Sequence, residues 1–252
     1  MSGPETGSIP FDRVAGSYDE TRGGLERGRR LAGILAGLLP ERGTLLEVGV
    51  GTGAVATGLT ELGRTVVGLD LSRPMLANAR GRLPGRVAAA DALRLPMRNG
   101  SVDGVLIIHV LHLVAEIPAT LAEAARVLRP GGTLAATGFP AGPVEGDVVE
   151  VLDRMHERVG SLRRDDAPET VLPMARAAGF ELVARIDEPG RPVSPRAAAD
   201  LIEARSQAWT WSIDDATWDQ VVRPGLAEVR ALPDQDRARP GPGPTVLAFR
   251  HS

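Results

Sequence analysis

A hydrophobic strand that runs into a glycine-rich loop constrains this chain more than any other segment. Residues 45–53 read LLEVGVGTG, in which Gly49, Gly51 and Gly53 stand at alternate positions ahead of a helical pattern. Glycine lets the backbone turn sharply and lets a ligand lie against the main chain, and the next helix begins with free N–H groups. This order of elements predicts an α/β fold with a ligand at the loop.

Short β-rich runs alternate with helical patterns along the rest of the chain, which favours a mostly parallel sheet covered by helices. We expect helices at residues 25–39, 52–62, 72–82 and 117–128. We expect seven strands, at residues 44–49, 65–70, 86–90, 102–109, 133–139, 180–187 and 245–250. The predicted fold class is a Rossmann-like, doubly wound, mostly parallel seven-stranded α/β sheet, with helical lid insertions after strand five and before the last strand.

The pattern loosens in the second half of the chain, but no second core is visible in it. We therefore expect a single domain, 1–252, with N-terminal cap helices over 1–40 and a core over 41–139. The segments 140–165 and 190–240 are predicted to be insertions on the substrate side.

Three tryptophans, Trp209, Trp211 and Trp218, lie in the second insertion of a chain that has one Tyr and four Phe. Their rings could stack on a planar ligand, because aromatic faces bind flat or cationic groups. They could equally anchor the insertion to the core.

Composition and charge exclude several classes of protein. The chain of 252 residues has no cysteine, which removes disulfide frameworks, thiol nucleophiles and Cys-ligated zinc. Its net charge of −3 gives no overall basic field for a polyanion, so no nucleic-acid partner is expected. We find no signal-peptide pattern and no apolar stretch long enough to span a bilayer, and we expect a cytoplasmic protein with no membrane partner. The sequence indicates no oligomeric state.

An acidic residue follows the glycine loop at a spacing that is typical of nucleotide-binding folds. Asp70 ends the second predicted strand, about 20 residues after the glycines, where nucleotide-binding folds place a carboxylate against ribose hydroxyls. The pattern indicates an adenosine-containing ligand. The segment GVGTGA also fits the fingerprint of dinucleotide-binding proteins, but Glu47 would repel a pyrophosphate and would suit the amino group of an amino-acid ligand.

Further motifs follow in order along the chain. Asp91 and Ala92 follow the third predicted strand in the context ADALRLP, and RVLRPGG leads into the fifth. With these pieces the sequence resembles the class I S-adenosylmethionine-dependent methyltransferases, and more narrowly their type 11 or UbiE-like small-molecule group. The group's pattern runs E-x-G-x-G-T-G, V-x-G-x-D-x-S-x-x-M-L, D-A-x-x-L-P, S-x-D-x-V, L-H and R-V-L-x-P-G-G. The resemblance is strong over residues 11–139.

The resemblance implies that S-adenosyl-L-methionine is the cofactor and that a methyl group passes to a small-molecule acceptor, at oxygen, nitrogen or carbon. Secondary metabolism is the expected setting. It implies that Asp70 holds the ribose hydroxyls and that Glu47 and the glycines line the methionine and ribose side. The N-terminal segment FDRVAGSYDETR resembles the group's element that folds over the cofactor. The cofactor-binding residues so implied are Tyr18, Arg22, Glu47, Gly49, Gly51, Gly53, Asp70, Leu71, Asp91, Ala92 and Ile108.

Three histidines are the candidates for a catalytic group. His109 ends the fourth predicted strand, at the sheet edge where ligands of α/β proteins bind, and could act as a base or orient the substrate. His112 matches the family's L-H position, with Leu113 where the family has a second His, and His156 lies in the first insertion. His109 and His112 lack a third ligand at a suitable spacing, so no metal site is expected.

Several alternatives remain open. Gly53 and Asp91 could serve only as turn or capping residues. The glycines and Asp70 would also suit a nicotinamide-dependent oxidoreductase, although Glu47 and the PGG turn oppose it and the chain has no Lys for a Tyr-x-x-x-Lys pair. A protein that binds S-adenosylmethionine without methylating anything would carry the same cofactor motifs.

Overall fold

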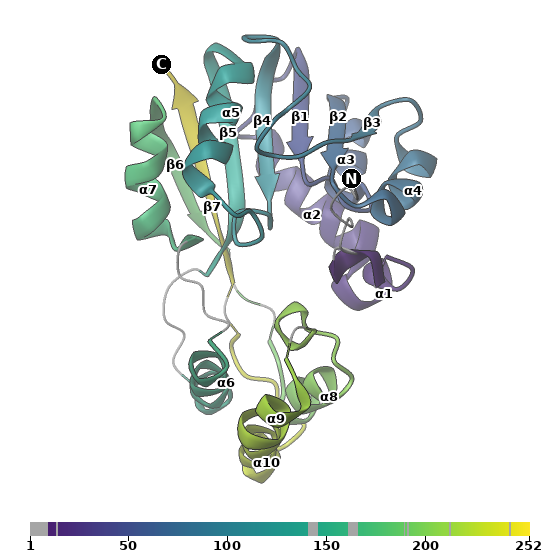
Figure 1. The fold of residues 1–252 in the computed structure, drawn as a ribbon, viewed down its shortest axis with the longest axis vertical. Coiled ribbons are helices and arrows are strands. Elements are labelled where there is room, and N and C mark those ends of the chain that lie inside the picture. The colour runs from purple at the N-terminus through teal and green to yellow at the C-terminus, as the bar shows by residue number, and fades with distance from the viewer. Residues whose placement is uncertain are drawn as a thin grey trace, which may run out of the picture. The chain divides into compact units, whose positions relative to one another are not determined.

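A computed structural model describes residues 10–13, 15–140, 146–160, 166–188, 190, 192–211, 213–241 and 243–252. In these residues helices and strands alternate from α2 to β3, β4 follows β3 directly, and α5 leads from β4 to β5 (Figure 1). The strands are β1 (Thr44–Val48), β2 (Thr65–Asp70), β3 (Val87–Ala89), β4 (Val102–Ile108), β5 (Leu128–Pro140), β6 (Phe180–Asp187) and β7 (Pro244–His251). The helices are α1 (Tyr18–Arg22), α2 (Gly24–Ala36), α3 (Ala54–Glu61), α4 (Arg73–Arg82), α5 (Ile117–Val127), α6 (Asp147–Arg158), α7 (Pro168–Ala177), α8 (Pro195–Glu203), α9 (Asp215–Thr217) and α10 (Arg223–Ala231).

The strands form one seven-stranded sheet in the order β3-β2-β1-β4-β5-β7-β6. The pairs from β3 to β5 are parallel, whereas β7 runs opposite to β4 (Figure 1). The predicted doubly wound, mostly parallel α/β sheet is thereby confirmed. The strand order reverses between β1 and β4, the kind of position where open α/β sheets bind ligands.

The central strands are apolar because both of their faces are covered. Residues 45–48 of β1 are all buried, and so are six of the seven residues of β4. Continuous apolar runs of this kind are typical of parallel strands with helices on both sides. The core around them is built from Leu45, Leu46, Leu106 and Ile107, each at most 1% exposed.

The fifth strand begins at Leu128, five residues before the predicted start at residue 133. Leu128 already pairs with Val102, and Thr133 pairs with Gly104, so residues 129–132 form a bulge in β5. The PGG segment lies in this bulge, where Gly131 has a φ of +77° that glycine adopts without strain.

The chain divides into two compact units. The first comprises Met1–Gly138, Pro168–Arg185 and Val246–Ser252, and the second comprises Phe139–Ala167 and Ile186–Thr245. The predicted insertions 140–165 and 190–240 thus belong to one unit. Its helices α6, α8 and α10 share a hydrophobic cluster that includes Met155, Ile202 and Val229, a core that the sequence pattern did not reveal.

The tryptophans pack within the second unit. Trp209 and Trp218 lie against its hydrophobic cluster, and the Arg205 guanidinium stands 4.2 Å from the centre of the Trp218 ring. The Trp211 indole N–H donates to the Arg205 carbonyl at 2.8 Å. These contacts give the rings a packing role inside their own unit. No helix of the described residues is both long and apolar enough to cross a membrane.

The core of the second unit predicts a contrast between two neighbouring residues of α8. Ile202 is 3% exposed in the cluster, whereas Leu201 is 39% exposed. We expect Ile202→Ala to lower the free energy of unfolding by about 2–5 kcal/mol, because it leaves a cavity, and Leu201→Ala to cost under about 1 kcal/mol. Denaturant unfolding followed by Trp fluorescence measures both. Equal losses would contradict the proposed core.

Candidate active site

Two cavities lie at the carboxyl ends of β1 to β4, in the first unit. The larger has a volume of about 470 Å³ and the smaller about 80 Å³. They share five lining residues, Tyr18, Gly49, Gly51, Ile108 and His109, and therefore adjoin. The larger volume lies within the range of small-molecule sites.

The glycine loop forms the boundary between the two cavities. The N–H groups of Gly49 and Val50 both donate to the Leu69 carbonyl, at 2.7 and 2.9 Å, which ties the loop to the end of β2. A Cβ on Gly49 would stand 2.2 Å from a Val110 methyl carbon, and the φ of +74° is one that side chains rarely adopt. Only glycine fits there, so the loop packs closely against Val110, and Gly49 lines both cavities with its backbone.

Asp70 links the glycine loop to the start of α4. One of its carboxylate oxygens accepts the Gly51 N–H at 2.7 Å and the other accepts the Ser72 N–H at 2.8 Å. Burial raises the pKa of the Asp70 carboxyl, and the N–H donors oppose that rise. Asp70 lines the larger cavity, and its oxygens retain lone pairs for further donors.

Glu47 places a buried carboxyl group beside the smaller cavity. Its side chain is 2% exposed, and its Oε2 atom has no hydrogen-bond partner among the described residues. Burial raises the pKa of the Glu47 carboxyl to about 8, the negative charge of Asp70 adds to the rise, and the Ala56 N–H opposes it. A buried acceptor without a donor is costly, so the position suits a cationic ligand group.

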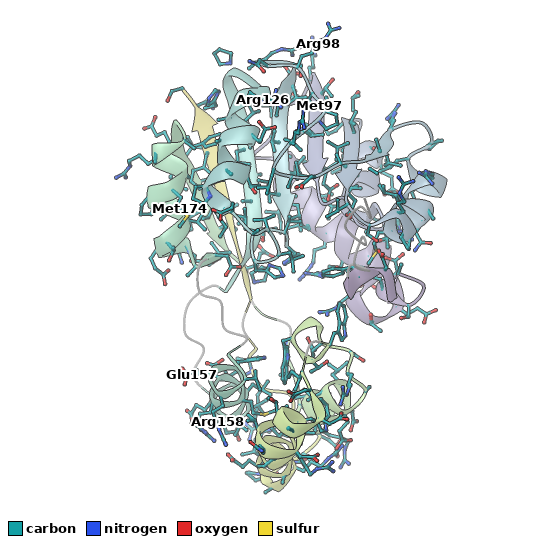
Figure 2. All side chains as sticks on the ribbon, in the orientation of Figure 1. Met97, Arg98, Arg126, Glu157, Arg158 and Met174 are labelled. Carbon is teal, nitrogen blue, oxygen red and sulfur yellow. The ribbon has the colours of Figure 1, made fainter. Side chains whose placement is uncertain are left out.

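The far wall of the larger cavity comes from the ends of β2 and β3. Leu71, Asp91 and Ala92 line it, and Asp91 accepts the Leu93 N–H at 2.9 Å in a local turn. Arg126 of α5 holds the loop that follows, since its guanidinium donates to the Leu95 and Met97 carbonyls at 2.9 and 2.8 Å. Figure 2 shows Arg126 beside Met97. Arg126, the first residue of the RVLRPGG motif, therefore fixes the loop that follows this wall, although it lines neither cavity.

The N-terminal segment supplies another wall. Tyr18 lines both cavities and Arg22 lines the smaller one. The Phe11 ring stands edge-on to the Tyr18 ring, with 6.2 Å between their centres, and lines the larger cavity.

His109 lies where the two cavities meet and is held in an unusual backbone conformation. Its φ is +54°, and its N–H donates to the Thr137 carbonyl at 2.7 Å. Arg27 Nη2 stands 2.5 Å from His109 Nε2. A guanidinium only donates, so Nε2 is the acceptor and the ring proton is on Nδ1. Burial, together with the positive charge of Arg27, lowers the pKa of His109 to about 3, and the ring is neutral.

The other two predicted histidines do not line these cavities. His112 is exposed in the segment after β4. His156 belongs to α6 in the second unit, where its ring stands edge-on to Trp209 with 4.7 Å between ring centres, and burial lowers its pKa. Among the residues that the structure describes, no group of three acidic or histidine side chains could hold a metal ion.

Comparison with known proteins decides the family. The family model described as "Methyltransferase domain" matches residues 46–136. Nocamycin O-methyltransferase of Saccharothrix syringae is 34% identical over 243 residues, which cover 85% of this chain and 84% of that protein. The chain belongs to the methyltransferase domain family.

Two further comparisons agree with this assignment. Demethylmenaquinone methyltransferase of Parafrankia sp. (strain EAN1pec) is 38% identical over 161 residues, 54% of this methyltransferase and 63% of that protein. A Thermotoga maritima structure, titled an S-adenosylmethionine-dependent methyltransferase and possible histamine N-methyltransferase, shares the fold. It has a TM-score of 0.57 at 20% identity, and the alignment covers 96% of this chain and 98% of that one.

The methyltransferase uses S-adenosylmethionine and transfers its methyl group to a small-molecule acceptor. The site fits this cofactor on its own evidence. The unpartnered Oε2 of Glu47 suits an ammonium group, and Gly49 and Gly51 line both cavities without a side chain between the backbone and a ligand. The family assignment disfavours the nicotinamide alternative.

Arg27 and Phe11 are cavity residues that the sequence analysis missed. Arg27 is one of several arginines on an amphipathic helix, and no local signal separates it from Arg29 or Arg30. The packing of α2 against α3 brings its side chain to His109. Phe11 is the first residue of the segment FDRVAGSYDETR, and an aromatic side chain next to a ligand-covering element is a signal that could have identified it.

Removal of the Asp70 carboxylate tests the adenosine side of the site. We expect Asp70→Ala to weaken S-adenosylhomocysteine binding by more than about tenfold, because ribose hydroxyls and the Gly51 N–H both lose an acceptor. Calorimetric titration measures the affinity. The matched control is Asp103→Ala, which removes a carboxylate that accepts the Thr44 N–H at 2.7 Å and lines neither cavity. Unchanged affinity in Asp70→Ala would refute the placement.

The raised pKa of Glu47 predicts that cofactor binding releases a proton. Below a pKa of about 8 the free protein holds Glu47 protonated, whereas an ammonium partner favours the carboxylate. Affinity for S-adenosylhomocysteine should therefore rise with pH between about 6 and 7.5, by up to about tenfold per pH unit, because deprotonation of Glu47 costs less free energy at higher pH.

Calorimetry at pH 7 in two buffers of different ionisation enthalpy measures this proton release directly. The control is Glu47→Gln, which cannot ionise and should bind more weakly with a flat pH profile. No proton release by the unsubstituted protein would contradict the assignment.

Proposed function

We propose that this methyltransferase methylates an oxygen atom of a small organic acceptor. The observation that carries the proposal is the extent of the match to nocamycin O-methyltransferase, which covers 85% of the chain and so extends beyond the cofactor core. The demethylmenaquinone methyltransferase match covers 54% of the chain. Acceptor choice depends on the parts outside the core, so the longer match is the better guide to the accepting atom.

We place the adenosine part of the cofactor in the larger cavity and the methionyl part in the smaller one. Asp70 would accept the ribose hydroxyls, and Leu71, Asp91, Ala92 and Ile108 would surround adenine. Glu47 would accept the ammonium group and Arg22 would meet the carboxylate, with Tyr18 and the glycine loop on either side. S-adenosylmethionine supplies, when bound, a methyl group on a positively charged sulfur that a nucleophile can displace in line.

His109 would orient groups at the point of transfer. Its Nε2 accepts from Arg27, so in this arrangement it has no free lone pair with which to take a proton. Its Nδ1 proton remains available as a donor. The rate then depends mainly on holding the reactants in line and excluding water, which can lower a barrier by about 7–11 kcal/mol.

This arrangement favours acceptor oxygens that are acidic. A carboxylate or an acidic enol is already ionised at neutral pH and needs no base, whereas an ordinary alcohol must lose a proton during transfer. We therefore propose an acceptor whose oxygen is ionised at neutral pH.

The second unit is proposed to recognise the acceptor. It contains the insertions 140–165 and 190–240, and with them His156 and the tryptophans. Glu157 and Arg158, labelled in Figure 2, lie on the same helix as His156. We propose that the chain is one functional domain and that it acts in the cytoplasm. Its net charge of −3 supports the proposal that it has no nucleic-acid partner.

An acceptor panel tests the proposal. S-adenosylmethionine with an isotopically labelled methyl group is offered with carboxylic acids, acidic enols, alcohols, amines and carbon nucleophiles, and products are located by mass spectrometry and NMR. We expect label on oxygen, with acids and enols ahead of alcohols. Label only on nitrogen or carbon would refute the proposal.

Two histidine variants test the proposed role of His109. We expect His109→Asn, which tolerates a positive φ, to lower kcat by at least about tenfold while the affinity for S-adenosylhomocysteine changes little. His112→Asn should have the smaller effect, since His112 lines neither cavity. Steady-state kinetics with the best acceptor measure both, and unchanged kcat in His109→Asn would remove it from the site.

A further inference from the structure

One arginine outside both cavities contacts two of their walls at once. Arg82, in the last turn of α4, donates to an Asp19 carboxylate oxygen at 2.5 Å and to the Thr52 carbonyl at 2.9 Å. The other Asp19 oxygen accepts the Thr52 hydroxyl at 2.7 Å. We call these three residues the Asp19–Thr52–Arg82 triangle. Asp19 belongs to the N-terminal segment and Thr52 to the glycine loop, and both line the smaller cavity, whereas Arg82 lines neither.

The triangle is enclosed by the packing of α4 against the glycine loop. Thr52 is 2% exposed, and the side chains of Arg82 and Asp19 are 24% and 29% exposed, so the ion pair is partly shielded from solvent. A Cβ on Gly53 would stand 3.3 Å from atoms of Ala79 and Leu83, which shows how closely the end of α4 approaches the glycine loop. Charge-assisted hydrogen bonds in such a place are stronger than those on an open surface.

Helix α4 also holds the N-terminal segment at two other points. The Ser72 hydroxyl donates to Asp12 at 2.6 Å, and the Asn78 amide donates to the Ala15 carbonyl at 2.8 Å. In the triangle a side chain of the N-terminal segment, Asp19, also bonds the glycine loop directly through Thr52. Arg82 holds both residues from outside the cavities, because it bonds the other oxygen of Asp19 and the Thr52 carbonyl.

We infer that Arg82 is a positioning residue for cofactor binding, because through Asp19 and Thr52 it fixes the N-terminal segment against the glycine loop where both line the smaller cavity. The inference rests on the proposed placement of the methionyl group in that cavity. Loss of Arg82 leaves every cavity-lining side chain in the chain, but it leaves the Thr52 hydroxyl as the one remaining partner of Asp19 in the triangle and so loosens the segment that carries Tyr18 and Arg22.

The test uses Arg82→Ala with two readouts. Tyr18 is the single tyrosine of the chain, so incorporation of 3-fluorotyrosine gives one fluorine-19 signal that reports on the N-terminal segment without any ligand. Calorimetry with S-adenosylhomocysteine gives the affinity. We expect Arg82→Ala to move the signal toward that of the unfolded chain and to weaken binding by at least about fivefold.

The matched control is Arg29→Ala, which breaks another arginine–carboxylate pair of the first unit, Arg29 with Glu61 at 2.7 Å, and lines neither cavity. It should change neither readout. If Arg82→Ala does not fold, Asp19→Asn removes the same ion pair with little change in shape. The double variant Arg82→Ala/Asp19→Asn should lose less affinity than the sum of the two single losses, because both single variants break the same ion pair.

Arg82→Ala with unchanged signal or unchanged affinity would overturn the inference, as would additive losses in the double variant. If S-adenosylhomocysteine did not bind the unsubstituted protein, the proposed placement would fail. The fluorine spectra of the free variants would still decide whether Arg82 holds the N-terminal segment in place.

Discussion

The pair of hydrogen bonds that Asp70 accepts fixes the geometry on which the site depends. Through Gly51 and Ser72 the carboxylate joins the loop after β1 to the helix after β2, so two neighbouring parallel strands end in one rigid wall. Parallel strands bring their carboxyl ends to the same edge of the sheet, and the reversal of strand order between β1 and β4 opens that edge. The cavities lie where this constraint leaves the backbone uncovered.

Electrostatic strain at this edge prepares it for a zwitterionic ligand. Glu47 is buried without a partner for one of its oxygens, while Arg27 and Arg22 line the same small cavity. In the free protein burial keeps the Glu47 carboxyl protonated below a pKa of about 8 and leaves one of its oxygens without a donor, and a ligand ammonium group would supply that donor and favour the carboxylate. The buried Glu47 carboxyl therefore favours a ligand with an ammonium group over a ligand without one. His109, kept neutral by burial and by Arg27, adds orientation without adding charge.

Local patterns predicted the sheet and most of the cavity wall, because strand periodicity and glycine loops are properties of adjacent residues. Gly49, Asp70 and His109 each end a predicted strand, Asp91 follows one, and all four line the cavities. The core of the second unit escaped prediction because it joins α6 to α8 and α10, more than 30 residues apart in sequence. Arg27 and Arg82 escaped for the same reason: each looks like a solvent-facing helical arginine until its distant partner, His109 or Asp19, is known.

A crystal structure of the S-adenosylhomocysteine complex tests the central claim most directly. The account predicts the ligand's amino group within hydrogen-bond distance of Glu47, its ribose hydroxyls on Asp70 and its sulfur near His109, where the two cavities meet. A ligand bound with its amino-acid end away from Glu47, or outside these two cavities, would contradict it.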